Sequence, residues 1–127
     1  MSEVGEFELG DFELQRGRVL LDAKLVYATY GSLAADRSNV ILYPTSYGAQ
    51  HTDIDWLIGK DRVLDPTRYF IVIPNMFTNG LSTSPSNCVP MLGGRRWPDI
   101  THVDNVRAQR QLLREHFKVE ALAMVYG

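Results

Sequence analysis

Hydrophobic and polar residues follow two patterns along this chain. Through the segment FELGDFELQRGRVLLDAKLVYATYGSL they alternate in short bursts, with apolar positions at Phe7 and Leu9, Phe12 and Leu14, and Leu25 and Tyr27. Such alternation is typical of antiparallel strands that keep one face in solvent. Gly17 and Gly31 separate the bursts and are expected to form turns. The first part of the chain is therefore predicted to form antiparallel strands.

The pattern changes at residue 39. NVILYPTS and YFIVIPN are continuous apolar runs rich in β-branched residues, as in strands of a parallel sheet that is covered on both faces. Between them, DIDWLIGKDRVLDPTRY is expected to hold a short helix or an irregular excursion. These two runs predict neighbouring parallel strands.

A helix is predicted after residue 101. Thr101 can cap it, and Asp104 lies three residues further on, as in a capping box. The apolar residues expected on its inner face are Val103, Val106, Leu113 and Phe117. The terminal ALAMVYG then predicts a further buried strand, parallel to the earlier ones through a right-handed crossover. The predicted fold class is α/β.

Ligand sites in open α/β sheets lie beyond the carboxyl ends of the strands. Here that rule selects three places: the loop PTSYGAQH after one strand, the loop PNMFTNGLSTSPSN after the next, and the position that would follow the terminal VYG. A serine hydrolase built on this plan has its nucleophile on a tight G-x-S-x-G turn and takes an oxyanion-hole N–H from an earlier loop. Gly127 fits the first glycine of such a turn.

Composition argues against nucleic-acid-binding and membrane-spanning proteins. The chain has 127 residues, 45% of them hydrophobic, and a formal net charge of −2, which gives no field to attract nucleic acid or an anionic membrane. No apolar stretch approaches the length that crosses a bilayer. The single cysteine, Cys88, cannot form an internal disulfide and no signal peptide precedes the acidic start, so a cytoplasmic location is expected.

Four blocks in order carry a specific resemblance. They are YATYGSL at residues 27–33, SNVIL at 38–42, DPTRYF at 65–70 and DNVRAQ at 104–109. Together they resemble the homoserine O-acetyltransferase family of the α/β-hydrolase superfamily. The resemblance implies that residues 1–127 are the N-terminal part of a single α/β-hydrolase domain, with antiparallel leading strands, then parallel strands with a crossover helix, incomplete without further polypeptide.

The resemblance also implies roles for individual residues. A nucleophilic serine would follow Gly127, the first glycine of the nucleophile elbow, and the Asp and His of the triad would lie further on. Aligning Gly48 with a glycine of the family's first loop puts Ser46 where its backbone N–H would point at the acyl oxyanion. Candidate substrate-binding residues in the two loops are Thr45, Tyr47 and Asn75. Acetyl-CoA would be the acyl donor and homoserine the acceptor, without a bound cofactor or metal.

Two departures keep other functions open. Pro44 stands where the family has histidine, and NMFTNGLSTSPSN replaces a loop richer in glycine. An esterase that passes the acyl group to water is therefore an alternative to ping-pong acyl transfer through an acyl-serine. A non-catalytic fragment or binding subunit is a further alternative.

The remaining polar motifs have simpler interpretations. The histidines, His51, His102 and His116, lack metal-ligand spacing and are expected at the surface or at helix ends. Each precedes the expected nucleophile, so none fits the base of the triad. A plain loop thiol is favoured for Cys88 over a nucleophile paired with His102. The GGRR turn and the carboxylates between residues 53 and 65 are expected to be solvated.

The expected partners follow from these interpretations. They are a complementary polypeptide that carries the triad and a small-molecule acyl donor and acceptor, with homo-oligomeric assembly left open. The chain alone is expected to be inactive and to aggregate or pack loosely, because its terminal strand would expose a backbone edge.

Overall fold

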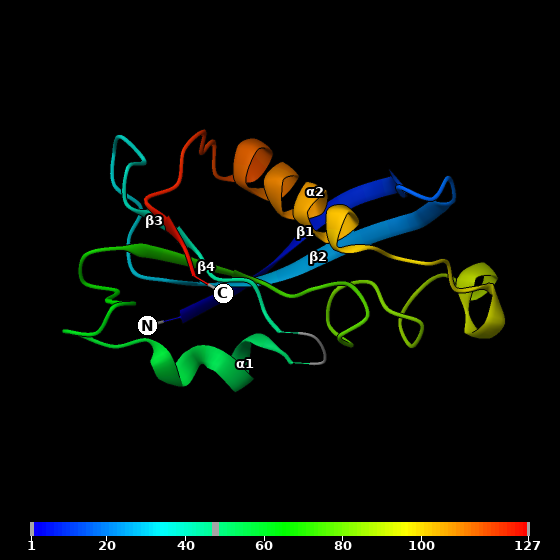
Figure 1. The fold of residues 1–127 in the computed structure, drawn as a ribbon, viewed down its shortest axis with the longest axis horizontal. Coiled ribbons are helices and arrows are strands. Elements are labelled where there is room, and N and C mark those ends of the chain that lie inside the picture. Colours follow the sequence, from blue (N-terminus) through cyan, green and yellow to red (C-terminus); the bar gives the residue numbers. More distant parts are fainter. Residues whose placement is uncertain (1, 47–48, 127) are drawn as a thin grey trace.

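A computed structural model describes residues 2–46 and 49–126, and its strands form one mixed sheet in the order β1-β2-β4-β3-β5 (Figure 1). The strands are β1 (Ser2–Glu13), β2 (Val19–Tyr30), β3 (Val40–Leu42), β4 (Phe70–Pro74) and β5 (Met124–Val125). The helical segments are α1 (His51–Ile54), α2 (His102–Gln111), the 3-10 turns η1 (Asp55–Leu57), η2 (Pro90–Leu92) and η3 (Gly94–Arg96), and the π-helical turn η4 (Leu112–His116).

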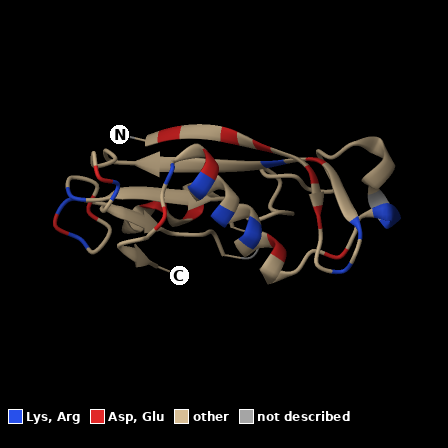
Figure 2. Ribbon diagram, turned by 90° about the horizontal axis from the view of Figure 1, so that it is seen from above, with Lys and Arg blue, Asp and Glu red and all other residues tan. Residues whose placement is uncertain are grey.

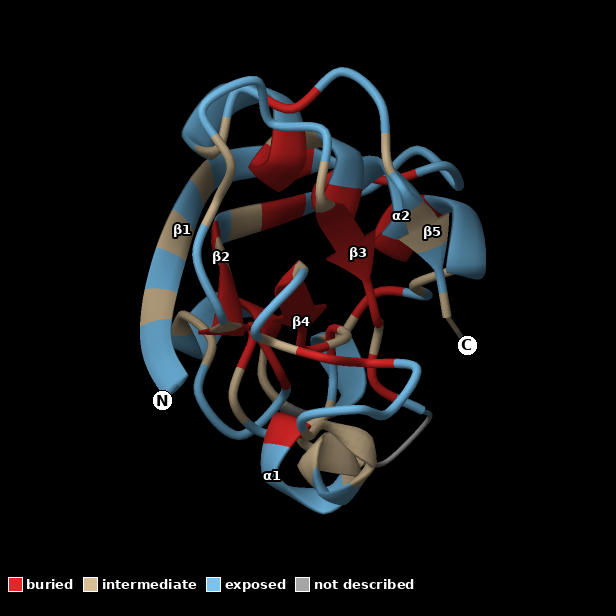
Figure 3. Cartoon of the chain, turned by 90° about the vertical axis from the view of Figure 1, so that its left-hand side faces the viewer, coloured by how far each residue is buried: buried red, intermediate tan, exposed pale blue. Residues whose placement is uncertain are grey.

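The predicted antiparallel strands at the start of the chain are confirmed. β1 and β2 form a long hairpin, and β2 also pairs antiparallel with β4. Gly17 and Gly31 lie at the predicted breaks with φ of 93° and 86°, a region that favours glycine. Exposed and half-buried residues largely alternate along β1, so this edge strand has one face in solvent (Figure 3).

The predicted parallel strands are also confirmed, and they form the centre of the fold. β3 pairs parallel with β4 on one side and with β5 on the other. Every residue of β3 and β4 is buried (Figure 3). The terminal strand is parallel and at an exposed edge, as predicted, but its burial is not confirmed: β5 has two residues, and Val125 keeps 61% of its surface exposed. In the described part of the chain, β5 pairs with β3 alone, so its outer edge and one face lack cover.

Helix α2 begins as predicted but presents a different face to the sheet. Thr101 Oγ1 accepts a hydrogen bond from Asp104 N at 3.3 Å, and Asp104 Oδ2 accepts one from Thr101 N at 2.9 Å. Val103 and Val106 are 46% and 60% exposed, so their predicted inward orientation is wrong. The reason is that Asp104 turns inward, where its Oδ1 accepts a hydrogen bond from Gln15 N of the hairpin turn at 2.8 Å.

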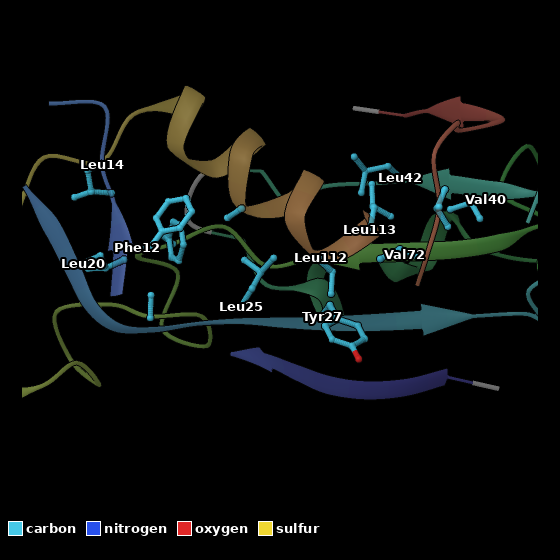
Figure 4. Close-up of a cluster of buried hydrophobic side chains, with 14 of the residues drawn as sticks. Phe12, Leu14, Leu20, Leu25, Tyr27, Val40, Leu42, Val72, Leu112 and Leu113 are labelled. Carbon is cyan, nitrogen blue, oxygen red and sulfur yellow. The ribbon is translucent and has the colours of Figure 1, made fainter. Parts of the chain in front are cut away.

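The main core lies between α2 and the sheet. Leu112 and Leu113, in the π-helical turn, pack against Tyr27, Leu42 and Val72 in the same buried cluster (Figure 4). The prediction that Leu113 and Phe117 lie toward the sheet is confirmed. The full set of buried residues in this cluster is Phe12, Leu14, Leu20, Ala23, Leu25, Tyr27, Val40, Leu42, Phe70, Val72, Phe77, Leu92, Ala108, Leu112, Leu113 and Val119.

The opposite face of the sheet is covered by the excursion between β3 and β4. Ile54, Leu57 and Ile58 pack there against a second buried cluster, on the side of the sheet away from α2 (Figure 1). The members of that cluster are Ala28, Ile41, Tyr43, Leu64, Ile71 and Ile73. The predicted short helix is thus present, and it supplies cover for the second face.

Charged residues are spread over the surface. Acidic residues are spaced along β1, and basic residues lie along α2 (Figure 2). Arg95 and Arg96 of the GGRR turn are exposed, as predicted. Among the described helices, none is long and apolar enough to cross a bilayer.

Candidate functional site

The two loops selected by the strand-end rule lie at the same edge of the sheet. We call residues 43–50 the β3 loop and residues 75–84 the β4 loop; Tyr47 and Gly48 lie outside the described residues. Because β3 and β4 are parallel, both loops leave the sheet at the strands' carboxyl ends. The two predicted loops are therefore neighbours, and a functional site next to them stays a prediction.

Hydrogen bonds join the two loops along their length. Thr45 N donates to Pro74 O at 3.3 Å, and Met76 N donates to Thr45 Oγ1 at 3.1 Å. Further along, Asn79 Nδ2 donates to Ala49 O at 3.1 Å, and Gln50 Nε2 donates to Asn79 O at 3.1 Å. The β3 loop is consequently held by the β4 loop at both of its described ends.

Asn75 is the centre of this network. It is fully buried, and its Oδ1 accepts hydrogen bonds from His51 N at 3.0 Å and from Asn79 Nδ2 at 2.9 Å. Its Nδ2 lies 3.0 Å from both Val26 O and His51 Nδ1. In the described part of the chain, no buried side-chain nitrogen or oxygen lacks a hydrogen-bond partner. Such complete satisfaction makes a buried polar network rigid.

The β4 loop is itself tied to β2 and α2. Ser82 Oγ donates to Asn75 O at 2.6 Å and accepts from Val26 N at 2.9 Å. Phe77 N donates to Asn105 Oδ1 at 2.9 Å, which links the loop to the first turn of α2. The loop is thus a rigid support rather than a free connection.

Ser46 lies on the exposed part of the β3 loop. Its carbonyl accepts a hydrogen bond from Ala49 N at 3.0 Å, and its side chain is exposed. None of the described residues accepts a hydrogen bond from Ser46 N, so this N–H is available to a ligand as far as the described chain goes. Gly127, the predicted start of the nucleophile turn, lies outside the described residues. The roles predicted for Ser46 and Gly127 stay predictions.

The candidate substrate-binding residues differ in their surroundings. Thr45 is 3% exposed and Asn75 is 0% exposed, and both use their side chains to hold the loops. A direct substrate contact by Thr45 or Asn75 stays a prediction, and Tyr47 lies outside the described residues.

One of the histidine predictions is wrong. His51 was expected at the surface or in a capping role, but it is 8% exposed and its imidazole contacts Asn75. The reason is that its backbone N–H and its ring both meet the Asn75 amide, which draws residue 51 into the space between the loops. His102 is exposed at the start of α2, and His116 Nε2 lies 2.9 Å from Tyr27 Oη.

The carboxylates between the parallel strands also differ from expectation. Asp65 was expected to be solvated, but it is 4% exposed because its carboxylate closes the turn before β4. Hydrogen bonds from the Thr67 hydroxyl and from the backbone N–H groups of Asp61 and Thr67 lower its pKa. Asp55 accepts a hydrogen bond from Tyr30 Oη at 3.1 Å, and burial first, then this contact, raises the pKa of Tyr30.

The remaining metal-ligating and titratable side chains of the described residues form no second candidate site. In residues 2–46 and 49–126, no group of three or more His, Cys, Asp or Glu side chains is placed to hold a metal ion. Cys88 is a partly exposed free thiol whose Sγ lies 3.6 Å from Pro85 O. Burial, followed by the neighbouring Tyr126, raises the pKa of Tyr43 at the base of the β3 loop.

A cavity lies beside the β4 loop. It has a volume of about 610 Å³ and opens between this loop and the start of α2, with Met76, Thr78, Trp97 and His102 in its walls. Met76 also donates its N–H to Thr45 of the β3 loop, so the cavity adjoins the loop that carries Ser46. A second hollow, of about 410 Å³, lies between α2 and β5 and is lined largely by apolar residues.

The chain has clear similarity to known enzymes, although no family model matches it. It is 41% identical to the ethyl acetate hydrolase of Pseudomonas veronii, over 97% of this chain and 36% of that protein. It is 36% identical to the homoserine O-acetyltransferase of Geobacter sulfurreducens, over 92% of this chain and 36% of that protein. The solved structure of an acetylester hydrolase from Corynebacterium glutamicum superimposes with a TM-score of 0.91 at 40% identity, covering 97% of this chain and 36% of that one.

These similarities define the fold and refine the predicted resemblance. The architecture is part of the α/β-hydrolase fold, and the chain spans about a third of the length of the curated relatives it matches. The relatives include hydrolases and acyltransferases, and the esterases match at higher identity than the homoserine O-acetyltransferases. The predicted family was therefore correct at the level of the superfamily and too narrow below it.

Proposed function

We propose that residues 1–127 form part of the single catalytic domain of a serine-dependent carboxylic-ester hydrolase that acts on small acyl esters. The observation that carries this proposal is the similarity, at about 40% identity and over nearly all of this chain, to two proteins described as an ethyl acetate hydrolase and an acetylester hydrolase. The departures at Pro44 and in the β4 loop also favour an acyl acceptor other than that of the acetyltransferases.

In the proposed mechanism, this chain contributes electrostatic stabilisation rather than the triad. A serine in further polypeptide attacks the ester carbonyl, and the alcohol leaves as the acyl-serine forms. The Ser46 N–H and a second N–H next to the nucleophile hold the oxyanion in both tetrahedral intermediates. Water then cleaves the acyl-serine. The buried supports of the β3 loop favour such a role, because a fixed donor needs no reorganisation during the reaction.

The partner of this chain is proposed to be the polypeptide that carries the serine, aspartate and histidine. Two features support such a partner. The outer edge of β5 is unpaired among the described residues, and the hollow between α2 and β5 is lined by apolar side chains that include Val106 and Val125. Exposed apolar surface of this kind marks a contact with further protein.

A second candidate function is acetyl transfer to homoserine from acetyl-CoA. It is favoured by the 36% identity to a homoserine O-acetyltransferase and by the four sequence blocks of that family. In that case the same acyl-serine would pass its acetyl group to the hydroxyl of homoserine instead of water.

One assay separates the two candidates. The full-length protein is incubated with a small acetate ester alone, and separately with acetyl-CoA with and without homoserine. The proposal predicts ester cleavage without an acceptor and no release of thiol from acetyl-CoA that depends on homoserine. Homoserine-dependent thiol release without ester cleavage would support the transferase, and no reaction in either arm would contradict both enzymatic proposals.

A further inference from the structure

The buried amide of Asn75 is placed to control the exposed β3 loop. We infer that Asn75, together with His51, is a positioning residue for the loop backbone that carries the Ser46 N–H. This inference rests on the proposed function for its catalytic consequence, but its structural part can be tested without activity.

The orientation of the Asn75 amide is fixed by backbone groups. His51 N can only donate, so the atom 3.0 Å away must be the amide oxygen. Val26 O can only accept, so the atom 3.0 Å from it must be the amide nitrogen. The amide therefore bridges β2 and His51, the residue that follows the β3 loop, in one orientation.

The NH₂ group of the Asn75 amide also contacts the ring of His51. The Asn75 NH₂ group has two protons, and one of them is used by Val26 O. His51 Nδ1 lies 3.0 Å from the same NH₂ group, which can only donate, so this contact is a hydrogen bond when Nδ1 carries no proton. A proton on Nδ1 would face the NH₂ group and break the contact. The His51 ring thus helps to hold the Asn75 amide in its orientation.

The Asn75 amide fixes the position of the loop relative to the sheet. Asn75 N donates to Val26 O at 2.8 Å, so the residue is held by β2 before its side chain reaches the loop. On the β3 side, Thr45 is held by Pro74 and Met76. Ser46 directly follows the anchor at Thr45, and its carbonyl accepts a hydrogen bond from Ala49 N, two residues before the anchor at His51. Loss of the anchor at His51 would loosen Ala49 and its hydrogen bond to Ser46, and the direction of the Ser46 N–H would no longer be fixed.

Four substitutions in the full-length protein test the inference. Asn75→Ala removes the bridge, and His51→Ala removes only its support. His51→Asn keeps an acceptor, since the Asn Oδ1 is as many bonds from Cα as the imidazole Nδ1. Asn39→Ala is the matched control. The Asn39 amide likewise bridges backbone groups, namely Ala34 N, Ser32 O and Arg68 O, but it lies at the opposite end of β3.

Two readouts are measured on each variant. Hydrogen exchange of residues 43–51 reports the order of the loop. Hydrolysis of a small acetate ester, with inhibition by a trifluoromethyl ketone that forms a tetrahedral adduct, reports oxyanion binding. We expect Asn75→Ala to speed exchange and to lower kcat about tenfold to a hundredfold with little change in KM, with an equal rise in the inhibitor Ki. His51→Ala should lower kcat less, and His51→Asn should recover most of that loss.

The outcomes separate this inference from the proposed function. Unchanged exchange in both Asn75→Ala and His51→Ala would overturn the inference, as would an equal loss of kcat in Asn39→Ala. Faster exchange with unchanged kcat and Ki would support the anchor and contradict the proposed oxyanion role of the loop. If Asn75→Ala does not fold, the His51→Ala and His51→Asn pair decides by the same criteria. If the unmodified protein cleaves no ester, the proposed function fails and the exchange measurement still decides the inference.

Discussion

Replacing Ser46 with proline removes one backbone N–H at the proposed oxyanion site. The change is mild for the described structure, because no described residue accepts a hydrogen bond from this N–H and the side chain is exposed. Proline requires an extended residue before it, and Thr45 N donates to Pro74 O in continuation of the β3–β4 pairing, as an extended residue would. Ser46→Pro is therefore expected to fold.

The expected effect on catalysis is large. Loss of one preorganised oxyanion donor costs about 2.7–4 kcal/mol of transition-state stabilisation, which is on the order of 10²–10³-fold in kcat. Ser46→Ala is the matched control, since it keeps the N–H and removes only an exposed hydroxyl. The control should change kcat by less than about threefold and the free energy of unfolding by less than about 0.5 kcal/mol.

The assay is steady-state hydrolysis of a small acetate ester by the full-length protein. It is accompanied by a thermal melt of each variant, so that unfolding is not mistaken for lost catalysis. The expected result is a fall in kcat with little change in KM for Ser46→Pro alone, because the donor acts only on the developing oxyanion. A folded Ser46→Pro variant with kcat within threefold of Ser46→Ala would refute the assignment.

Three further predictions concern stability of the full-length protein. Asp104→Ala removes the acceptor of two backbone N–H groups and should lower the free energy of unfolding by about 2–3 kcal/mol. Its control, Asp99→Ala, removes one partner of an exposed ion pair and should lower it by less than about 1 kcal/mol. Denaturant titrations measure both, and equal effects would contradict the role of Asp104 as a buried cap. Gly31→Ala should be far more destabilising than Gly17→Ala in thermal melts. Both glycines have positive φ, but a Cβ added at Gly31 would lie 2.3 Å from a backbone oxygen, whereas a Cβ added at Gly17 would meet no atom within 4 Å. The pKa of Asp65 is lowered in the folded protein, so its contribution to stability is present at neutral pH. That contribution is lost as the pH falls from about 3.9, the ordinary aspartate pKa, through the lower folded pKa. Asp65→Asn should flatten this part of the stability–pH profile, and an unchanged profile would contradict the stabilising role of the Asp65 carboxylate.

Local patterns predicted much of this fold correctly. The hairpin, the two buried parallel strands and the cap at Thr101 follow from alternation, from continuous β-branched runs and from capping chemistry, which depend on nearby residues. The inner face of α2 did not follow. The inward turn of Asp104 depends on a hydrogen bond to Gln15, which is 89 positions away in the chain, and hydrophobic periodicity carries no signal of such a contact.

The rule placed the two loops at one edge of the sheet, as the structure has them, but the residues that hold the loops in place were missed. The strand-end rule selected both loops, because it needs only the order of strands. It could not show that His51 is buried against Asn75, since a histidine after a strand is compatible with many surroundings. The density of Asn, Ser and Thr in the β4 loop was the available signal, because such side chains satisfy buried backbone groups in irregular segments.

The most direct test of the account is a crystal structure of the full-length protein bound to a trifluoromethyl ketone. The tetrahedral adduct places a charged oxygen where the ester oxyanion forms. We expect the Ser46 nitrogen to lie about 2.7–3.1 Å from that oxygen, with the β3 loop held by Asn75 as described. An adduct whose oxygen is held by other donors, with the Ser46 N–H directed elsewhere, would contradict the account.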